Sequence, residues 1–190
     1  TQEQKAVLLQ AMKTHGLDVY LSMYAEKNWW TTLDSNWTFV CNGGGIALAL
    51  AMAEDYPQES FTLIENALRS CEFAFPRYAP DGGWYEGPGY WGYAMQFLSY
   101  LIATLESGIG TDYDFKKNTG LSETMNFYLS VTGANGKAFS YSDASAPASA
   151  NAEYGIWLGH VYSQPTWVKL RADIAKNGAV AQDLLYYYPE

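Results

Sequence analysis

Residues 43–54 read GGGIALALAMAE, and this stretch decides the fold class. Alanine and leucine dominate it, and both are strong helix formers. Wound into a helix, the run is apolar on nearly every side, as in helices that a protein core surrounds. We therefore predict a deeply buried helix here, opened by Gly43, Gly44 and Gly45, with close helix packing as the reason for the three glycines.

The helical period extends along the chain in both directions from this stretch. Upstream, residues 2–24 form a helical pattern that is interrupted near Gly16. Downstream, Pro57 suits the first turn of a helix that runs through Phe75 toward Pro80. Further helical patterns cover 93–107, 122–129, 151–162 and 165–176.

Helices joined by short turns favour stacked antiparallel hairpins. Only residues 138–141 look extended, and the longest irregular stretch, 133–150, is rich in Gly, Ala and Ser. No linker divides the chain. The sequence therefore predicts an all-α fold of antiparallel helix hairpins, organised as one helical domain over residues 1–190.

Composition excludes several classes of function. The net charge of -9 argues against nucleic acid as a partner, because nucleic-acid-binding proteins carry a basic footprint. No apolar run is long enough to span a bilayer, so we expect no membrane partner. Cys41 and Cys71 lie in apolar stretches where free buried thiols are the usual state. With only His15 and His160 besides, no metal-ligand spacing is present, and we expect no metal and no cofactor.

Aromatic residues, 16% of the sequence, are concentrated in connections between the predicted helices. The connections 28–42, 81–93 and 133–150 all carry Trp or Tyr side chains. Exposed aromatic area is unfavourable unless a ligand or a neighbour covers it. Loops on a rigid scaffold are also where binding residues tend to lie. The pattern therefore indicates a binding surface formed by these connections.

Two of the connections contain long motifs. Residues 34–44 read DSNWTFVCNGG, and residues 81–94 read DGGWYEGPGYWGYA. Together, in this order, they resemble the paired signatures of the heparinase II/III-like polysaccharide lyases and the related alginate lyases. The resemblance covers residues 25–94 with good specificity and the remaining helices more loosely. It implies an incomplete (α/α) toroid joined to a C-terminal β-sandwich domain, which this chain lacks.

The resemblance implies cleavage of a uronate-containing glycan by β-elimination. In that chemistry a Tyr protonates the leaving glycosidic oxygen, and a Tyr or His removes the C5 proton. Asn36 would neutralise the substrate carboxylate, and Tyr90 would be the catalytic tyrosine. The partner would be an acidic polysaccharide or oligosaccharide, handled together with the missing β-domain of the same protein. A secreted or periplasmic bacterial enzyme is implied. The expected substrate-binding residues are Trp37, Asn42, Trp84, Tyr85 and Glu86.

The chemistry of these residue types agrees with such roles. A side-chain amide can donate to a carboxylate where negative charge develops, and a phenol can give a proton to an alkoxide. If Asn36 and Tyr90 act together, both must open onto the same cleft. Alternatives stay open for each residue. Asn36 can cap a helix, and Tyr90 can be a packed aromatic residue. Glu86 suits a structural or substrate-orienting role better than that of a general acid.

Other interpretations remain for Trp37 and Trp84, which can stack on sugar faces or inside the core. Asp143 is interpreted as a residue that fixes its loop. An α/α-toroid glycoside hydrolase would need paired carboxylates, for which Asp34, Glu86 and Asp143 are available. A noncatalytic glycan-binding domain is the third possibility. Since only 11 Lys and Arg are present, a sparsely sulfated uronate such as alginate fits better than heparin.

Overall fold

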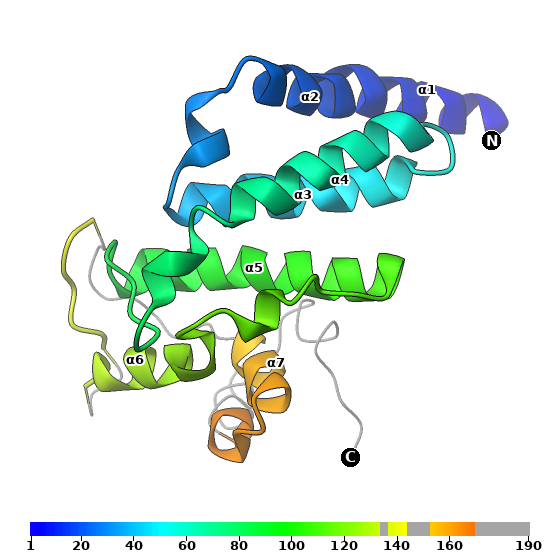
Figure 1. Ribbon diagram of the computed structural model, residues 1–190. Helices are drawn as coiled ribbons and strands as arrows, with labels where there is room; N and C mark the ends of the chain where they lie inside the picture. The colour runs from blue at the N-terminus through cyan, green and yellow to red at the C-terminus, as the bar shows by residue number, and fades with distance from the viewer. Residues whose placement is uncertain (134–136, 144–152, 170–190) are drawn as a thin grey trace. The chain divides into compact units, whose positions relative to one another are not determined.

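The computed structural model describes residues 1–133, 137–143 and 153–169, and this part of the chain is predominantly helical (Figure 1). It contains no β-strand; the one pairing of extended residues is an isolated antiparallel bridge between Thr132 and Ala138. The predicted all-α class is confirmed. The toroid stays a prediction.

The chain divides into two compact units. The first comprises Thr1–Phe75 and Tyr100–Asp112, and the second comprises Pro76–Ser99 and Tyr113–Glu190. Helix α5 (Pro88–Ile109) contributes its first part to the second unit and its last part to the first. The single domain expected over residues 1–190 stays a prediction.

The first unit begins with two helices that follow each other without a loop (Figure 1). α1 (Gln2–Met12) and α2 (Asp18–Ala25) are joined by a π-helix, Lys13–Leu17. The interruption predicted near Gly16 therefore takes the form of a wider helical turn. A Cβ atom at Gly16 would lie 2.7 Å from Leu48 Cδ2, so glycine lets the helix that carries Leu48 approach this turn closely.

Helix α3 (Asn36–Met52) starts earlier than the sequence pattern indicated. Ser35 is its N-cap, and the Ser35 hydroxyl accepts a hydrogen bond from the Trp37 N–H at 3.4 Å. The three glycines consequently lie inside the helix and do not open it, which corrects the prediction. Close packing is seen at two of them, because a Cβ atom would lie 3.2 Å from the Tyr20 hydroxyl at Gly44 and 3.1 Å from the Tyr20 ring at Gly45.

Burial around α3 is less uniform than expected. Ile46, Ala49 and Met52 are fully buried, but Ala47 and Ala51 on the opposite side are exposed. Alanine is tolerated on a solvent-facing side because it has little apolar surface and a high helix propensity. The apolar pattern thus predicted the helix correctly and overestimated how much of it is covered.

Helix α4 (Pro57–Cys71) pairs with α3, and Pro57 occupies its first turn as predicted. The helix ends at Cys71 instead of running on to Phe75, and a short 3-10 helix, Phe75–Tyr78, follows. One cluster of the apolar core of this unit is formed by the buried side chains of Leu17, Ala49, Met52 and Leu63.

A buried amide joins three helices of the first unit. The Asn42 side chain on α3 donates to Ser70 Oγ on α4 at 2.9 Å and accepts from the Tyr24 hydroxyl on α2. Beside it, the Tyr20 hydroxyl donates to the Cys41 carbonyl at 2.9 Å. Both polar ends of the fully buried Asn42 amide are therefore satisfied, as buried polar groups require.

The second unit contains the first part of α5, α6 (Thr124–Ser130), α7 (Glu153–Val161) and two short 3-10 helices, Phe115–Lys117 and Leu121–Glu123. α5 begins before the predicted start at residue 93. A further helical segment occupies residues 165–169, and the rest of the helix expected over 165–176 lies outside the described residues.

Trp91 is the centre of the second unit's core. Its ring stacks on Tyr128 with centroids 4.9 Å apart and meets the Tyr154 ring edge-on at 5.7 Å. Its indole N–H donates to Thr124 Oγ1 at 2.7 Å, and that hydroxyl donates in turn to the Gly82 carbonyl at 2.9 Å. One tryptophan thus fixes α5, α6 and the turn at Gly82 to one another.

Replacing Asn42 by alanine tests the buried amide. The Asn42→Ala protein leaves the Tyr24 and Ser70 hydroxyls without their amide partner, and we expect the free energy of unfolding to fall by about 2–4 kcal/mol. Gln10→Ala, which removes an exposed amide on α1, should change it by less than about 0.5 kcal/mol. Urea denaturation followed by circular dichroism measures both. Equal effects of the two substitutions would contradict the role assigned to Asn42.

Candidate functional site

The first motif places its residues on the initial turns of α3. Asn36 is the first residue of the helix and is only 3% exposed. The next residue, Trp37, is half exposed and meets the exposed ring of Trp29 edge-on, with centroids 5.3 Å apart. The exposed feature of this motif is therefore a tryptophan pair and not the asparagine.

Two residues of this motif differ from what we expected. A residue that neutralises a substrate carboxylate must present its amide to the ligand, and the buried Asn36 does not open onto a cleft in this structure. Ser35, not Asn36, is the cap of α3. Asn42 is fully buried, and its amide is engaged by Ser70 and Tyr24, so it lines no surface that a substrate reaches.

The two cysteines flank this buried amide as free thiols. Burial raises the pKa of Cys41 to about 11. Burial, followed by the charge of Glu72, raises the pKa of Cys71 well above its ordinary range. A thiol with a raised pKa stays protonated at neutral pH and is a poor nucleophile, so neither cysteine is suited to covalent catalysis.

The second motif begins with a tight turn in the second unit. The Gly83 N–H donates to the Asp81 carboxylate at 3.2 Å. Gly82 has a φ of 80°, and a Cβ atom there would lie 2.4 Å from the Thr124 backbone. Only glycine fits this conformation and this close approach. The Asp-Gly element of the motif therefore has a structural function.

The next residues alternate between the core and the surface. Trp84 is 1% exposed, and its indole N–H donates to the buried Glu86 carboxylate at 3.0 Å. The Tyr141 hydroxyl donates to the Trp84 carbonyl at 2.6 Å. Trp84 is thus a core residue and offers no ring face to a sugar, and the buried Glu86 carboxylate binds its indole N–H.

Exposed phenols stand beside these buried groups. Tyr85 is 44% exposed. Tyr90, 37% exposed, lies in the first turn of α5 and not in the turn that precedes the helix. Tyr93, one helical turn further along, is also exposed and packs edge-on against Phe97. In the second motif, the tyrosines are therefore exposed to solvent, and the tryptophans are buried and hold the segment in place.

Sequence reasoning missed Arg77. This exposed residue on the 3-10 helix Phe75–Tyr78 places its guanidinium over the Tyr85 ring, 4.6 Å from the centroid. It precedes the second motif and belongs to none of the aromatic connections. The only signal in the sequence was its position beside that motif in a chain with few cations.

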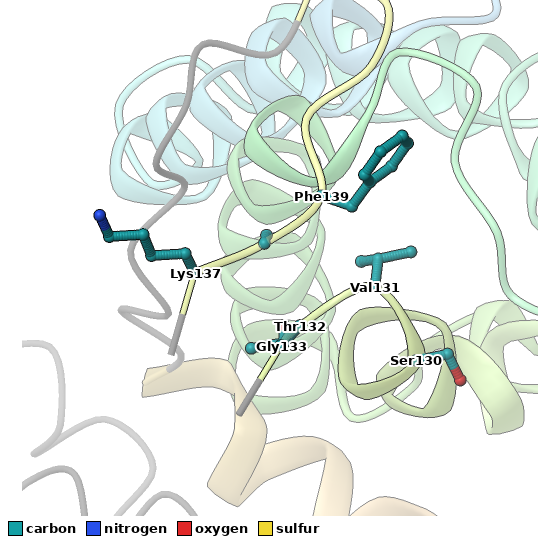
Figure 2. Close-up of a pocket in the computed structure, with 7 residues that line it drawn as sticks. Ser130, Val131, Thr132, Gly133, Lys137 and Phe139 are labelled. Carbon is teal, nitrogen blue, oxygen red and sulfur yellow. The ribbon is translucent and has the colours of Figure 1, made fainter. Parts of the chain in front are cut away.

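In the third aromatic connection, residues 137–139 pair antiparallel with residues 131–133 at the end of α6. Figure 2 shows its shallow pocket, lined by Val131, Lys137 and Phe139 among others. Phe139 is 71% exposed, and its ring lies 6.4 Å from that of Tyr141. Because the Tyr141 hydroxyl also donates to the Trp84 carbonyl, residues 137–143 are tied to the second motif. Asp143 is exposed in the turn that follows, and residues 144–150 lie outside the described residues.

Other chemistry is not assembled in the described part of the chain. Within residues 1–133, 137–143 and 153–169, no cluster of three or more His, Cys, Asp or Glu side chains is placed to hold a metal ion. His15 and His160 are both exposed. None of the helices in these ranges has the length and apolarity needed to cross a membrane.

Comparison with known proteins adds no family assignment. Neither a protein-family model nor a curated protein matches the chain. The resemblance to the heparinase II/III-like lyases stays a prediction that the two motifs carry.

Thiol labelling tests the environment of the first motif. Because the pKa of Cys41 is raised to about 11, its thiolate fraction grows about tenfold per pH unit between pH 8 and pH 10. Its alkylation rate by iodoacetamide should rise in the same proportion, measured by mass spectrometry of its peptide. Cys71 should remain unlabelled in the folded protein. In urea both should react with the ordinary thiol pKa of about 8.5. A plateau for folded Cys41 below pH 9.5 would contradict the assignment.

Proposed function

We propose that this chain is the helical, glycan-binding part of a polysaccharide lyase that cleaves a uronate-containing polymer by β-elimination. The observation that supports it is the exposure of Tyr85 and Tyr90 on the second motif, next to a buried and hydrogen-bonded Trp84 and Glu86. In this arrangement, buried and hydrogen-bonded residues hold the exposed aromatic side chains in fixed positions at the surface.

Exposed aromatic side chains suit a sugar ligand. The face of a sugar ring carries C–H groups that pack on an aromatic ring, and the tyrosine hydroxyl binds the sugar hydroxyls. Rings held in place before binding lose little conformational entropy when the ligand arrives. The Trp29–Trp37 pair of the first unit offers a second aromatic surface of the same kind.

The chemistry assigned to Tyr90 is proton donation. A base removes the proton at C5 of the uronate, the electron pair forms the C4–C5 double bond, and the C4–O bond of the glycosidic link breaks. The leaving oxygen takes the phenolic proton of Tyr90. Phenols as a class are protonated at neutral pH, which suits this step.

Two further roles in the reaction, positioning of the substrate-binding surface and removal of the C5 proton, are assigned to other groups. Because Asn36 is buried, we propose that it helps to position the adjacent, exposed Trp37 and does not contact the substrate. The base is assigned to the β-sandwich domain that the family resemblance implies. A sparsely sulfated polymer suits the net charge of -9, and a secreted or periplasmic bacterial location suits such a substrate.

The two competing functions are less well supported. A glycoside hydrolase needs two carboxylates that flank the scissile bond, but Glu86 is buried and accepts the Trp84 indole N–H. A purely binding domain would use the same exposed rings without needing Tyr90 as a proton donor. Substitution of Tyr90 therefore separates that possibility from the lyase.

Ultraviolet absorbance tests the proposal, because elimination leaves a conjugated double bond. Uronate polymers are incubated with the chain and with a longer form that carries the β-domain. We expect an absorbance rise with the longer form, and a loss of at least about a hundredfold in rate in its Tyr90→Phe variant. Tyr93→Phe, an exposed phenol one turn away, is the matched control and should stay within about twofold.

Two outcomes would contradict the proposal. New reducing ends without a rise in absorbance would show hydrolysis. Equal rates for Tyr90→Phe and Tyr93→Phe would remove Tyr90 from the reaction.

A further inference from the structure

Phe139 is the most exposed large hydrophobic side chain in the described part of the chain, with 71% of its surface in solvent. It lines a shallow pocket of about 550 Å³, and Figure 2 shows its ring and the Val131 side chain at this pocket. A single exposed hydrophobic residue is common at protein surfaces. Phe139 is set apart by the way its backbone is held and by the aromatic residues that continue from it.

The backbone on either side of the ring is fixed to α6. The Phe139 N–H donates to the Val131 carbonyl at 2.6 Å. The preceding residue, Ala138, is buried and forms the antiparallel bridge with Thr132. The Thr132 hydroxyl donates in turn to the Tyr128 carbonyl on α6 at 2.7 Å. The ring therefore projects from a segment with little backbone freedom left to lose when a ligand covers it.

A second ring leads from Phe139 to the second motif. The centroid of the Tyr141 ring lies 6.4 Å from that of Phe139, with 32° between the two ring planes. The Tyr141 hydroxyl donates to the carbonyl of Trp84 at 2.6 Å, and the residue after Trp84 is the exposed Tyr85. All of these residues belong to the second unit. Phe139 thus extends the exposed aromatic surface of the second motif.

A sugar unit fits this extension better than a protein partner. Phe139 is accompanied only by the half-buried Val131 and Tyr141, whereas a stable protein interface takes about 20–30 residues a side. The two tilted rings are spaced on the scale of one unit of a linear glycan, and the C–H face of a sugar packs well on such rings. A phenyl ring has no polar atom, so it binds this face and does not read the charge of the sugar.

We infer that Phe139 and Tyr141 form an accessory subsite, which binds one further sugar unit of a long glycan chain through its apolar face. The inference rests on the proposed glycan-binding function and deepens it, because it makes affinity depend on the length of the bound chain. Phe139 contributes binding alone, separate from proton donation by Tyr90.

Affinity for oligomers of different length tests the accessory subsite. Oligomannuronates of two and of six units are titrated into the full chain, and their dissociation constants are measured by calorimetry. The two-unit oligomer is too short to cover the second motif and the accessory subsite together. Phe139→Ala should weaken binding of the six-unit oligomer about fivefold or more and leave that of the two-unit oligomer within about twofold. Phe139→Tyr keeps the ring and should keep both affinities.

Phe61→Ala is the matched control, because Phe61 is a phenylalanine of similar exposure, 66%, on α4 of the first unit. It should leave both affinities within about twofold. Equal weakening of the two oligomers by Phe139→Ala, or no weakening of either, would overturn the accessory subsite while glycan binding itself stood.

Sedimentation of the same proteins separates a sugar from a second copy of this chain as the occupant. We expect the unmodified protein and Phe139→Ala to have the same mass in solution. A dimer that Phe139→Ala dissociates would make the ring a contact between copies and overturn the inference. If the unmodified protein bound neither oligomer, the proposed function would fail, and the accessory subsite with it.

Discussion

The hydrogen bond between the Trp84 indole and the Glu86 carboxylate is the constraint on which the candidate surface depends. It holds Trp84 in the core against Tyr78, and the carbonyl of the same tryptophan accepts the Tyr141 hydroxyl. With Trp84 turned inward, the next side chain, Tyr85, turns outward. A buried carboxylate is costly unless its hydrogen bonds are made, so this arrangement also explains why an acidic residue is tolerated here.

Local pattern predicted two features of the first unit well. The break near Gly16 and the helix start at Pro57 depend on the backbone properties of single residues, which sequence shows directly. The starts of α3 and α5 were missed because both lie in aromatic-rich segments that we assigned to connections. Aromatic residues pack equally well in helices and in loops, so composition could not separate the two.

The candidate site was predicted in part, for a related reason. Sequence located the two motifs but could not tell which of their aromatic residues are buried. Trp84 and Tyr85 are adjacent and chemically similar, and only tertiary packing sends one inward and the other outward. Arg77 was missed because its partner ring lies in another segment. The predicted site residues of the first motif are consequently buried apart from Trp37, whereas the second motif carries the exposed tyrosines.

The masses of the products test the central claim, glycan cleavage by elimination, most directly. A uronate oligosaccharide of a single length is digested by a longer form of the protein that would carry the proposed β-domain, and the masses of the fragments are measured by mass spectrometry. Elimination transfers a proton within the reaction and adds no water, so the masses of the two fragments should sum to that of the substrate. A sum larger by one water molecule would show hydrolysis and contradict the lyase.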